Sequence, residues 1–441
     1  MDKKILRLAV PSLVSNITVP LLGLADVAIV GHLGAASYIG AIAVGGMLFS
    51  MVYWLFGFLR MGTSGLTSQA YGAHDLAEAV GVLARSLLVG LLMGSVLVAF
   101  QMPLRWLAFR CMEMSDDVRS LAQAYFHICV WGAPAVLGLY GLNGWFVGMQ
   151  NARLPMWVAI VQNVLNIAAS LCLVYGFGMK VEGVAWGTLV AQYGGFLLAL
   201  ALAFRFYGRL WGRFRLASVW HGGALRRFFR INRDIFLRTL CLVAVSVFFT
   251  SGGARQGDMV LAANTLLMQF FTFFSYVMDG FAYAGEALSG RYVGAFDVGL
   301  LKCCVRRLFR WGLGLAVFFS LLYISGGETI LGLLTDDSDV LRIAHDYLGW
   351  VWLIPFAGFA AFLWDGIFIG ATASRQMLQS MWVASVVFFA CFFALRGWWG
   401  NHALWFAFVA YLAVRGVMQA WLSRSIYTMI TRSPHRLARQ L

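Results

Sequence analysis

The segment Asn143-Gly-Trp-Phe-Val-Gly148 returns as Asp365-Gly-Ile-Phe-Ile-Gly370, displaced by 222 positions in a chain of 441 residues. The segments Gly72-Ala-His-Asp75 and Gly294-Ala-Phe-Asp297 have the same displacement. One spacing that recurs at separated places indicates an internal repeat, and a repeat reveals the architecture before any local motif does. The sequence therefore predicts two copies of one structural unit.

The composition is typical of a membrane protein. Hydrophobic residues make up 61% of the chain and charged residues 12%, with a mean hydropathy of +0.78, whereas an ordinary soluble domain has roughly 25% charged residues. Continuously apolar runs of about 20 residues are long enough to cross a bilayer as helices, and strands of a barrel would alternate apolar and polar residues instead. We predict an all-α integral membrane protein with twelve transmembrane helices in two six-helix bundles. The spans lie near 9–31, 38–60, 80–101, 121–146, 155–177, 184–205, 234–253, 259–281, 308–326, 343–369, 381–399 and 402–423.

The predicted spans also define the domains. Because each copy has an even number of spans, both copies start on the same side of the membrane and form a parallel repeat, with a central cleft expected between them. We expect an N-terminal six-helix bundle at 1–205, a basic cytoplasmic linker at 206–233, a C-terminal six-helix bundle at 234–424 and a cytoplasmic tail at 425–441.

Lys and Arg residues cluster at the start of the chain, in the 206–233 linker, in 302–310 and in 424–439. Loops that stay in the cytoplasm are enriched in Lys and Arg, so both termini are expected to be cytoplasmic. The net charge of +14 is then explained by topology and by contact with anionic lipid headgroups, and we expect no nucleic-acid partner.

The seven Cys and seven His residues are scattered, without paired or zinc-binding spacing. We therefore expect no disulfide, no metal site, no cofactor and no enzymatic activity. The chain also lacks a Walker loop, so ATP does not drive it directly. An ion gradient is the remaining source of energy unless the protein is passive.

Asp26 lies in the first predicted span, after Pro20. A carboxylate within the bilayer costs several kcal/mol, so it needs a partner, a water-filled cavity or a protonation cycle. Burial without a nearby cation favours the neutral carboxyl, which suits a group that binds and releases a proton. The alternative is a structural Asp that a neighbouring helix satisfies or that lies near the outer headgroups.

Spans five and six contribute further polar residues at apolar depth, namely Asn163, Asn166, Ser170 and Thr188. Asn166 and Ser170 are four residues apart and therefore share one helix face, where they could hydrogen-bond Asp26 or a water beside it. Small and polar residues also act as packing contacts between membrane helices, and this alternative stays open.

The second copy has its own acidic residues within spans. Asp279 and Glu286 are seven residues apart on one helix face, and Asp365 lies in span ten. All three are candidates for contact with a cationic substrate, although Glu286 could simply pair with Arg291. Met278 could line an adaptable cavity for apolar substrates, or fill the core.

Two other patterns favour structural roles. Asp234 and Arg238, four residues apart, are interpreted as an intrahelical ion pair. The Gly-x-x-x-Gly spacings at 144–148 and 366–370 predict close helix packing.

The two copies differ where the polar residues lie. A shift of 222 positions pairs Asp365 of the second copy with Asn143 of the first. The polar residues of the first copy have apolar counterparts: Asp26 pairs with Phe248, Asn166 with Phe388, Ser170 with Phe392 and Thr188 with Ala410.

The two bundles, the stretch Leu24-Ala-Asp-Val-Ala-Ile-Val-Gly-His-Leu-Gly34 and Asn163-Val-Leu-Asn166 resemble the MATE family of multidrug and toxic compound extruders. The resemblance covers essentially the whole chain. Longer stretches are similar to its DinF (DNA-damage-inducible protein F) branch. They are Ser15 to Leu24, Asn232 to Arg238, Leu363 to Thr372 and Gly400 to Trp405.

The resemblance implies a V-shaped antiporter in the bacterial cytoplasmic (inner) membrane, which exports cationic or lipophilic compounds in exchange for H⁺ or Na⁺. The DinF branch is generally proton-coupled. The resemblance places the family's first-span carboxylate on Asp26, its span-five Asn on Asn166 and its span-six Thr on Thr188. Ser170 stands where many members have a second carboxylate, so a Na⁺ cage in this bundle is disfavoured, because hard cations prefer several oxygen ligands.

We therefore expect a monomeric secondary antiporter that works by alternating access. Asp26 is the expected protonation site, with Asn166, Ser170 and Thr188 beside it, and Pro20 is the expected hinge. Asp279, Asp365, Glu286 and Met278 are the expected substrate contacts. The alternatives are a Na⁺-coupled exporter, a lipid-linked precursor flippase, which would need a cleft lined by Arg and Lys, and a membrane enzyme acting on lipids.

Overall fold

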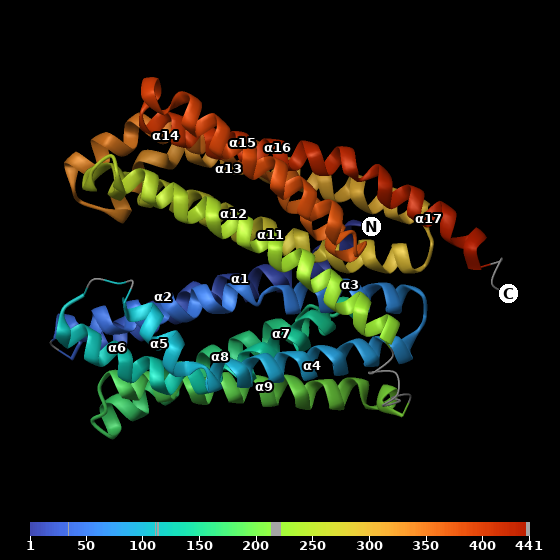
Figure 1. Ribbon diagram of the computed structural model, residues 1–441, viewed down its shortest axis with the longest axis horizontal. Helices are drawn as coiled ribbons and strands as arrows, with labels where there is room; N and C mark the ends of the chain where they lie inside the picture. Colours follow the sequence, from blue (N-terminus) through green and yellow to red (C-terminus); the bar gives the residue numbers. More distant parts are fainter. Residues whose placement is uncertain (34, 111, 113, 213–221, 438–441) are drawn as a thin grey trace. The chain divides into compact units, whose positions relative to one another are not determined.

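The computed structural model describes residues 1–441 apart from 34, 111, 113, 213–221 and 438–441, and the described residues contain no strand. Cys111 and the arginines at 213 and 215 of the expected linker fall outside the described residues. The helices of the first half are α1 (Asp2–Gly31), α2 (Ala36–Leu55), α3 (Phe58–Gly72), α4 (Leu76–Ala99), α5 (Gln101–Arg110), α6 (Asp116–Cys129), η1 (Val130–Gly132), α7 (Ala133–Gly148), α8 (Arg153–Leu171), η2 (Cys172–Gly176) and α9 (Val181–Trp211) (Figure 1). Those of the second half are α11 (Gly222–Ala254), α12 (Asp258–Gly294), α13 (Val298–Leu334), α14 (Ser338–Gly370), α15 (Ser374–Trp399), α16 (Asn401–Leu422) and α17 (Arg424–Leu437).

The prediction of twelve membrane spans is confirmed. Within the described residues, 12 helical segments are long and apolar enough to cross a membrane. Four of them combine consecutive helical pieces. They are Ala36–Gly72 (α2 and α3), Asp116–Gly148 (α6, η1 and α7), Arg153–Gly176 (α8 and η2) and Asn401–Thr428 (α16 and the start of α17). Each predicted span overlaps one of these segments.

The chain divides into two compact units, Val14–Phe229 and Met1–Leu13 with Arg230–Leu441. The division at Phe229 falls inside the segment expected to link the bundles. By its contacts, the segment Met1–Leu13 of the expected bundle 1–205 groups with the second unit, and the expected domain boundaries stay a prediction.

Contacts with α12 and α13 explain where the first turns of α1 belong. The side chain of Asp2 forms an ion pair with Arg307 at 3.3 Å and accepts a hydrogen bond from the indole of Trp311 at 3.3 Å. Gly280 on α12 lets the backbones approach, because a Cβ there would lie 3.0 Å from the carbonyl oxygen of Ala9. These contacts hold the start of α1 in the second unit.

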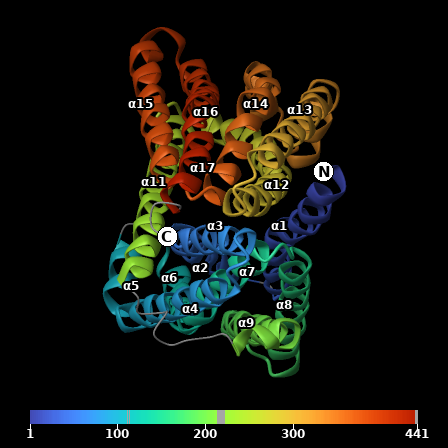
Figure 2. The same ribbon diagram turned by 90° about the vertical axis from the view of Figure 1, so that its right-hand side faces the viewer.

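In the unit Val14–Phe229, α7 packs against α3 and α4, α8 packs against α9, and α2 packs against α6. Two apolar cores form there. One joins α1, α2, α6 and the start of α9, and the other joins α4, α7, α8 and the end of α9. In the other unit, α14 contacts α12, α13 and α16, and α16 also packs against α15; Figure 2 shows the same helices after a turn of 90°.

The turns of the two halves repeat in detail. Positive φ angles occur at His74 (58°) and Gln150 (65°), and again 222 positions later at Phe296 (56°) and Thr372 (51°). The helices that follow His74 and Phe296 have the same N-cap. The carboxylates of Asp75 and Asp297 each accept a hydrogen bond from the backbone N–H group three residues later in the chain, at 2.9 and 2.8 Å. The repeat seen in the sequence is therefore a repeat of backbone geometry.

The Gly-x-x-x-Gly spacings mark close helix crossings in both halves, which confirms that prediction. A Cβ at Gly144 would overlap the carbonyl oxygen of Arg60 on α3, and a Cβ at Gly366 would overlap that of Ala282 on α12. The two overlaps are equivalent positions of the repeat. Glycine is needed at both because the neighbouring backbone occupies the space of a side chain.

The ends of the expected linker and the expected tail are helical. Helix α9 continues to Trp211, α11 begins at Gly222, and α17 covers Arg424–Leu437. Helix α11 thus extends the seventh span by more than ten residues beyond its predicted start.

Candidate functional site

Asp26 lies on α1, in the part of the helix that belongs to the Val14–Phe229 unit. The residue is 6% exposed, and its Oδ1 atom has no hydrogen-bond partner among the described residues. No ion pair of Asp26 is found in the described ranges either. A buried carboxyl oxygen without a partner is costly and is therefore a reason to look for function.

Two hydrogen bonds hold this part of α1 against α8 and η2. The Asn163 amide donates to the carbonyl oxygen of Thr18 at 2.9 Å, and the Tyr175 hydroxyl donates to that of Ile29 at 3.0 Å. Asp26 lies between these two anchors along α1, and the second anchor comes from the π-helix η2, which follows α8. Single π-helical turns occur frequently at functional sites.

The side chains of Tyr125 and Cys129 on α6 interact electrostatically with Asp26. They are one helical turn apart and in polar contact with each other, and Tyr125 also contacts the side chain of Thr188 on α9. The ring of Tyr125 packs where Gly45 leaves room on α2, because a Cβ at Gly45 would overlap that ring. Sequence reasoning missed both residues, since Tyr and Cys in an apolar span look like core residues.

Thr188 extends this group of side chains to α8. The amide of Asn166 donates to the Thr188 hydroxyl at 3.1 Å, while its Oδ1 has no partner among the described side chains and backbone groups. Ser170, one turn further along α8, is fully buried where Gly187 of α9 allows close approach. Asn166 and Ser170 do share one face, as predicted, and that face is turned toward α9.

The first unit therefore brings two polar side chains of α6 to Asp26, and Tyr125 connects them through Thr188 on α9 to Asn166 on α8. We define the Asp26 site as Asp26, Tyr125, Cys129, Asn166 and Thr188. Its hydroxyl, thiol and amide groups can reorient to donate to a carboxylate or accept from a carboxyl. The arrangement can stabilise Asp26 in either protonation state, and it holds one carboxylate.

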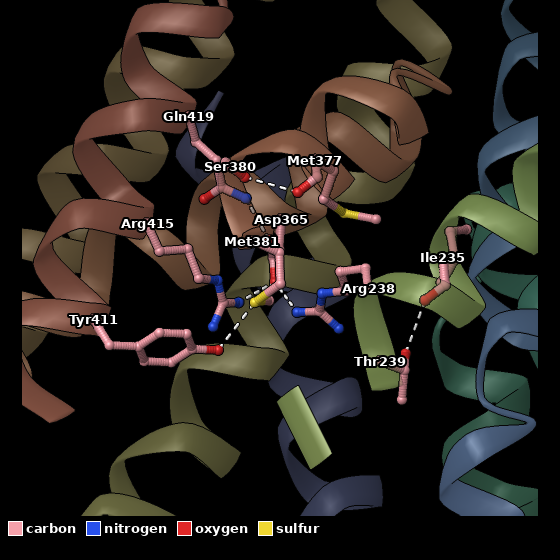
Figure 3. Close-up of polar contacts among 10 residues, drawn as sticks. All are labelled: Ile235, Arg238, Thr239, Asp365, Met377, Ser380, Met381, Tyr411, Arg415 and Gln419. Atoms are coloured by element: carbon pink, nitrogen blue, oxygen red, sulfur yellow. Dashed lines mark hydrogen bonds and ion pairs between the residues drawn. The ribbon is translucent and has the colours of Figure 1, made fainter. Parts of the chain in front are cut away.

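Asp365 has a different environment in the second unit (Figure 3). Its carboxylate is held by the guanidinium groups of Arg238 on α11 and Arg415 on α16, and it accepts from the amide of Gln419. Asp365 and Arg238 are each 6% exposed, and Arg415 is 3% exposed. We call these four residues the arginine cluster. The negative charge of Asp365 is already compensated from within the bundle.

The interpretation of Asp234 and Arg238 as an intrahelical pair is wrong. Arg238 pairs with Asp365, 127 positions away. The carboxylate of Asp234 instead contacts Arg233 at 3.0 Å and accepts from the Ser374 hydroxyl at 2.9 Å. The reason is geometric, because Arg238 is turned into the bundle, where Asp365 on α14 supplies the counter-charge.

The other expected contacts lie on α12 and α1. Asp279 is half-buried and interacts electrostatically with Tyr276. Glu286 is 1% exposed and Met278 is fully buried. Pro20 lies inside α1, which is helical throughout Asp2–Gly31. The structure does not bring Asp365 into a group with Asp279 and Glu286, because its carboxylate faces α11 and α16 rather than α12.

Comparisons with known proteins identify the family. The family model described as MatE matches residues 11–171 and again residues 235–395, once in each half. The chain is 40% identical to the DNA damage-inducible protein F of Escherichia coli strain K12 over 96% of this chain and 92% of that protein. It is 26% identical to the probable multidrug resistance protein NorM of Rhizobium meliloti strain 1021, over 97% of this chain and 94% of that protein.

Solved structures show the same fold. A crystal structure of MATE in the bent conformation superposes with a TM-score of 0.88 at 18% identity, covering 98% of this chain and 96% of that one. The MATE transporter VcmN of Vibrio cholerae, also in a bent form, gives 0.83 at 19% identity, with coverages of 98% and 97%. With twelve spans, two repeated halves and a family match in each, this chain belongs to the MATE family of multi-pass membrane transporters.

Proposed function

We propose that this transporter is a secondary antiporter, which exports cationic or lipophilic small molecules across the bacterial cytoplasmic membrane in exchange for protons. We further propose Asp26 as the protonation site. The observation that carries this proposal is the buried carboxyl of Asp26, which has an unpartnered oxygen and no ion pair among the described residues. A buried carboxyl that no cation neutralises can change its charge by binding a proton.

The contrast with Asp365 supports this choice. Both carboxyl groups are buried on membrane-spanning helices, but two guanidinium groups already neutralise Asp365. Protonation of Asp365 would leave two buried cations without a counter-charge, which is strongly unfavourable. We therefore assign Asp365 to structure rather than to substrate, and retain Asp279 and Glu286 as candidates for contact with a cationic substrate.

The polar neighbours of Asp26 suggest how protonation changes the bundle. An ionised Asp26 attracts the Tyr125 hydroxyl and the Cys129 thiol as donors, whereas a neutral carboxyl can itself donate. A change in the protonation of Asp26 thus reorients the Tyr125 hydroxyl. Because Tyr125 contacts Thr188, the reorientation also affects the hydrogen bond from Asn166 on α8. In the proposed cycle, a proton from outside neutralises Asp26, α1 repacks around Pro20, substrate leaves outward, and release of the proton inward resets the transporter.

Proton coupling is preferred to Na⁺ coupling because the Asp26 site contains a single carboxylate. Na⁺ is a hard cation that favours several oxygen ligands, and Ser170 contributes a neutral hydroxyl where a second carboxylate would strengthen binding. The proposed cytoplasmic location of both termini follows from the basic segments described above and remains part of this proposal.

Purified protein in proteoliposomes tests the proposal. Efflux of a fluorescent cationic dye is measured with a pH gradient and, separately, with a Na⁺ gradient. We expect the pH gradient alone to drive transport and Asp26→Asn to abolish it. Asp117→Asn, which removes an exposed carboxylate at the start of α6, is the matched control and should transport normally. Dye transport that follows only the Na⁺ gradient, or persists in Asp26→Asn, would reject proton coupling through Asp26.

A further inference from the structure

A cavity of about 350 Å³ lies in the second unit, where α11 and α15 end. It is outside the Asp26 site and outside the arginine cluster. Two aromatic rings, two arginines and two small polar side chains define its character. They are Phe248, Phe392, Arg255, Arg396, Ser251 and Gln256.

The aromatic wall of this cavity is the repeat counterpart of the Asp26 site. Phe248 and Phe392 occupy the positions of Asp26 and Ser170 after the shift of 222. The ring of Phe248 lies 5.1 Å from that of Phe392 and 5.9 Å from that of Phe388, the counterpart of Asn166, with edge-to-face geometry in both pairs. Where the first unit presents a carboxyl to the helix interface, the second presents an apolar surface that favours burial of a hydrocarbon or aromatic body.

The polar rim of the cavity is cationic. Arg255 follows α11 and Arg396 lies in the last turn of α15, and both side chains are exposed. Neither guanidinium group forms an ion pair with any described residue. The guanidinium carbon of Arg396 lies 5.2 Å from the centroid of the Phe393 ring, a cation–π contact beside the cavity. Two free guanidinium groups beside an apolar wall match an anion attached to an apolar body.

The amide of Gln256, unlike the two guanidinium groups, is already used in hydrogen bonds within the protein. It donates to the carbonyl oxygen of Gly252 at 3.1 Å and to Asn401 at 3.4 Å, and so ties the end of α11 to the start of α16. Ser251 adds a hydroxyl on the exposed side of α11. The donors that can face an anion are therefore the two arginines and Ser251.

We propose that this cavity binds an amphiphilic anion. Its carboxylate, phosphate or sulfonate head lies between Arg255 and Arg396, and its apolar body lies against Phe248 and Phe392. The volume is at the lower end of the roughly 300–1,000 Å³ that small-molecule sites span, so it accommodates a head group and the first part of a chain. This ligand has the opposite charge to the cationic substrates proposed above, and the site does not depend on them.

The test uses the full-length protein in phosphatidylcholine nanodiscs and radiolabelled dodecyl phosphate, with binding to empty nanodiscs subtracted. Each charge-assisted contact is worth about tenfold in affinity, so the double variant Arg255→Gln/Arg396→Gln should bind about 100-fold more weakly. Phe248→Leu should also weaken the binding of dodecyl phosphate, because the first part of its chain loses contact with the aromatic ring. Dodecyltrimethylammonium should not compete, because its head is cationic.

Arg342→Gln is the matched control. Arg342 is an exposed arginine near the start of α14, at the same end of the unit as the cavity, but it does not line it. It should bind dodecyl phosphate as the parent protein does. Equal binding by the double variant and the parent would overturn the proposal. So would an equal loss in Arg342→Gln, because the effect would then be one of surface charge. Arginines near helix C-termini also offset the helix dipole, so thermal unfolding of each variant is measured to separate binding from stability.

The head group could belong to a membrane phospholipid or to a free amphiphile. Native mass spectrometry of protein extracted from membranes that contain phosphatidylglycerol distinguishes these sources. If a phospholipid fills the cavity, the parent protein retains one more anionic phospholipid than Arg255→Gln/Arg396→Gln does. If both retain the same number, while the double variant still fails to bind dodecyl phosphate, the ligand is a free amphiphile.

Discussion

Replacing Asp365 with Asn should destabilise the second unit strongly. The carboxylate lies between two guanidinium groups that come from α11 and α16, and all three residues are at most 6% exposed. An Asn side chain keeps the size of Asp but removes the only anion of the arginine cluster. Arg238 and Arg415 would then be two buried cations facing one another without a counter-charge.

The expected loss is about 3–5 kcal/mol in the free energy of unfolding, the usual cost of removing one partner from a buried ion pair. Asp26→Asn provides the internal comparison, because Asp26 has no ion pair among the described residues and should cost less than about 1 kcal/mol. A triple variant, Asp365→Leu with Arg238→Met and Arg415→Met, removes all three charges. It should recover most of the loss, since apolar residues of similar volume replace buried ion pairs without penalty.

Two buried thiols make it possible to follow each unit separately. Cys129 lies in the first unit and Cys304 in the second, and both are buried. In variants whose only cysteine is Cys129 or Cys304, unfolding by SDS in mixed micelles is followed by reaction of the thiol with a maleimide dye. Asp365→Asn should lower the SDS midpoint reported by Cys304 much more than the midpoint reported by Cys129. An unchanged Cys304 midpoint would refute the reasoning, and a triple variant as unstable as Asp365→Asn would show that packing, not charge, explains the loss.

Three further predictions follow from the described contacts. Tyr125→Phe removes the hydroxyl that links Asp26 to Thr188 on α9, so dye efflux driven by a pH gradient should fall about tenfold while dye binding is retained; a parallel loss of binding would indicate a structural role instead. Gly366→Ala should lower the free energy of unfolding by about 1–3 kcal/mol, because the new methyl group overlaps the carbonyl of Ala282. In the control Gly349→Ala, on the same helix, the new methyl group meets nothing within 4 Å. This variant should be as stable as the parent or slightly more stable in the same SDS titration. Ser170→Asp adds a second carboxylate near the site and should make efflux respond to an imposed Na⁺ gradient, and efflux that still ignores Na⁺ would weaken the argument from oxygen ligands.

The fold could be predicted in detail because its signals are local. Span number depends on runs of apolar residues, and the repeat depends on similar short segments, so no knowledge of distant contacts was needed. The close crossings at Gly144 and Gly366 were predictable for the same reason, since small residues four apart on a membrane helix mark backbone contact. Asp26 was also visible, because an acidic residue in an apolar span stands out in any single sequence.

The partners of these residues were not predictable in the same way. Spacing along one helix suggested that Arg238 pairs with Asp234, but its partner lies 127 positions away, because rotation of α11 about its axis turns Arg238 toward α14. Tyr125 and Cys129 carry no formal charge and fit an apolar helix face, so nothing local indicated that they lie beside Asp26. Likewise, the first thirteen residues belong to the second unit because of contacts that Gly280 permits on α12.

The sequence by itself determined the twelve membrane-spanning helices, the two repeated halves and the presence of one unusual carboxyl in the first span. Only the tertiary structure decided that Asp365 is already neutralised, whereas Asp26 has an oxygen without a hydrogen-bond partner among the described residues. The physical reason is that the cost of a buried charge depends on the distance to its nearest counter-charge. That distance depends on how separate helices pack and rotate, and hydropathy and periodicity do not record it.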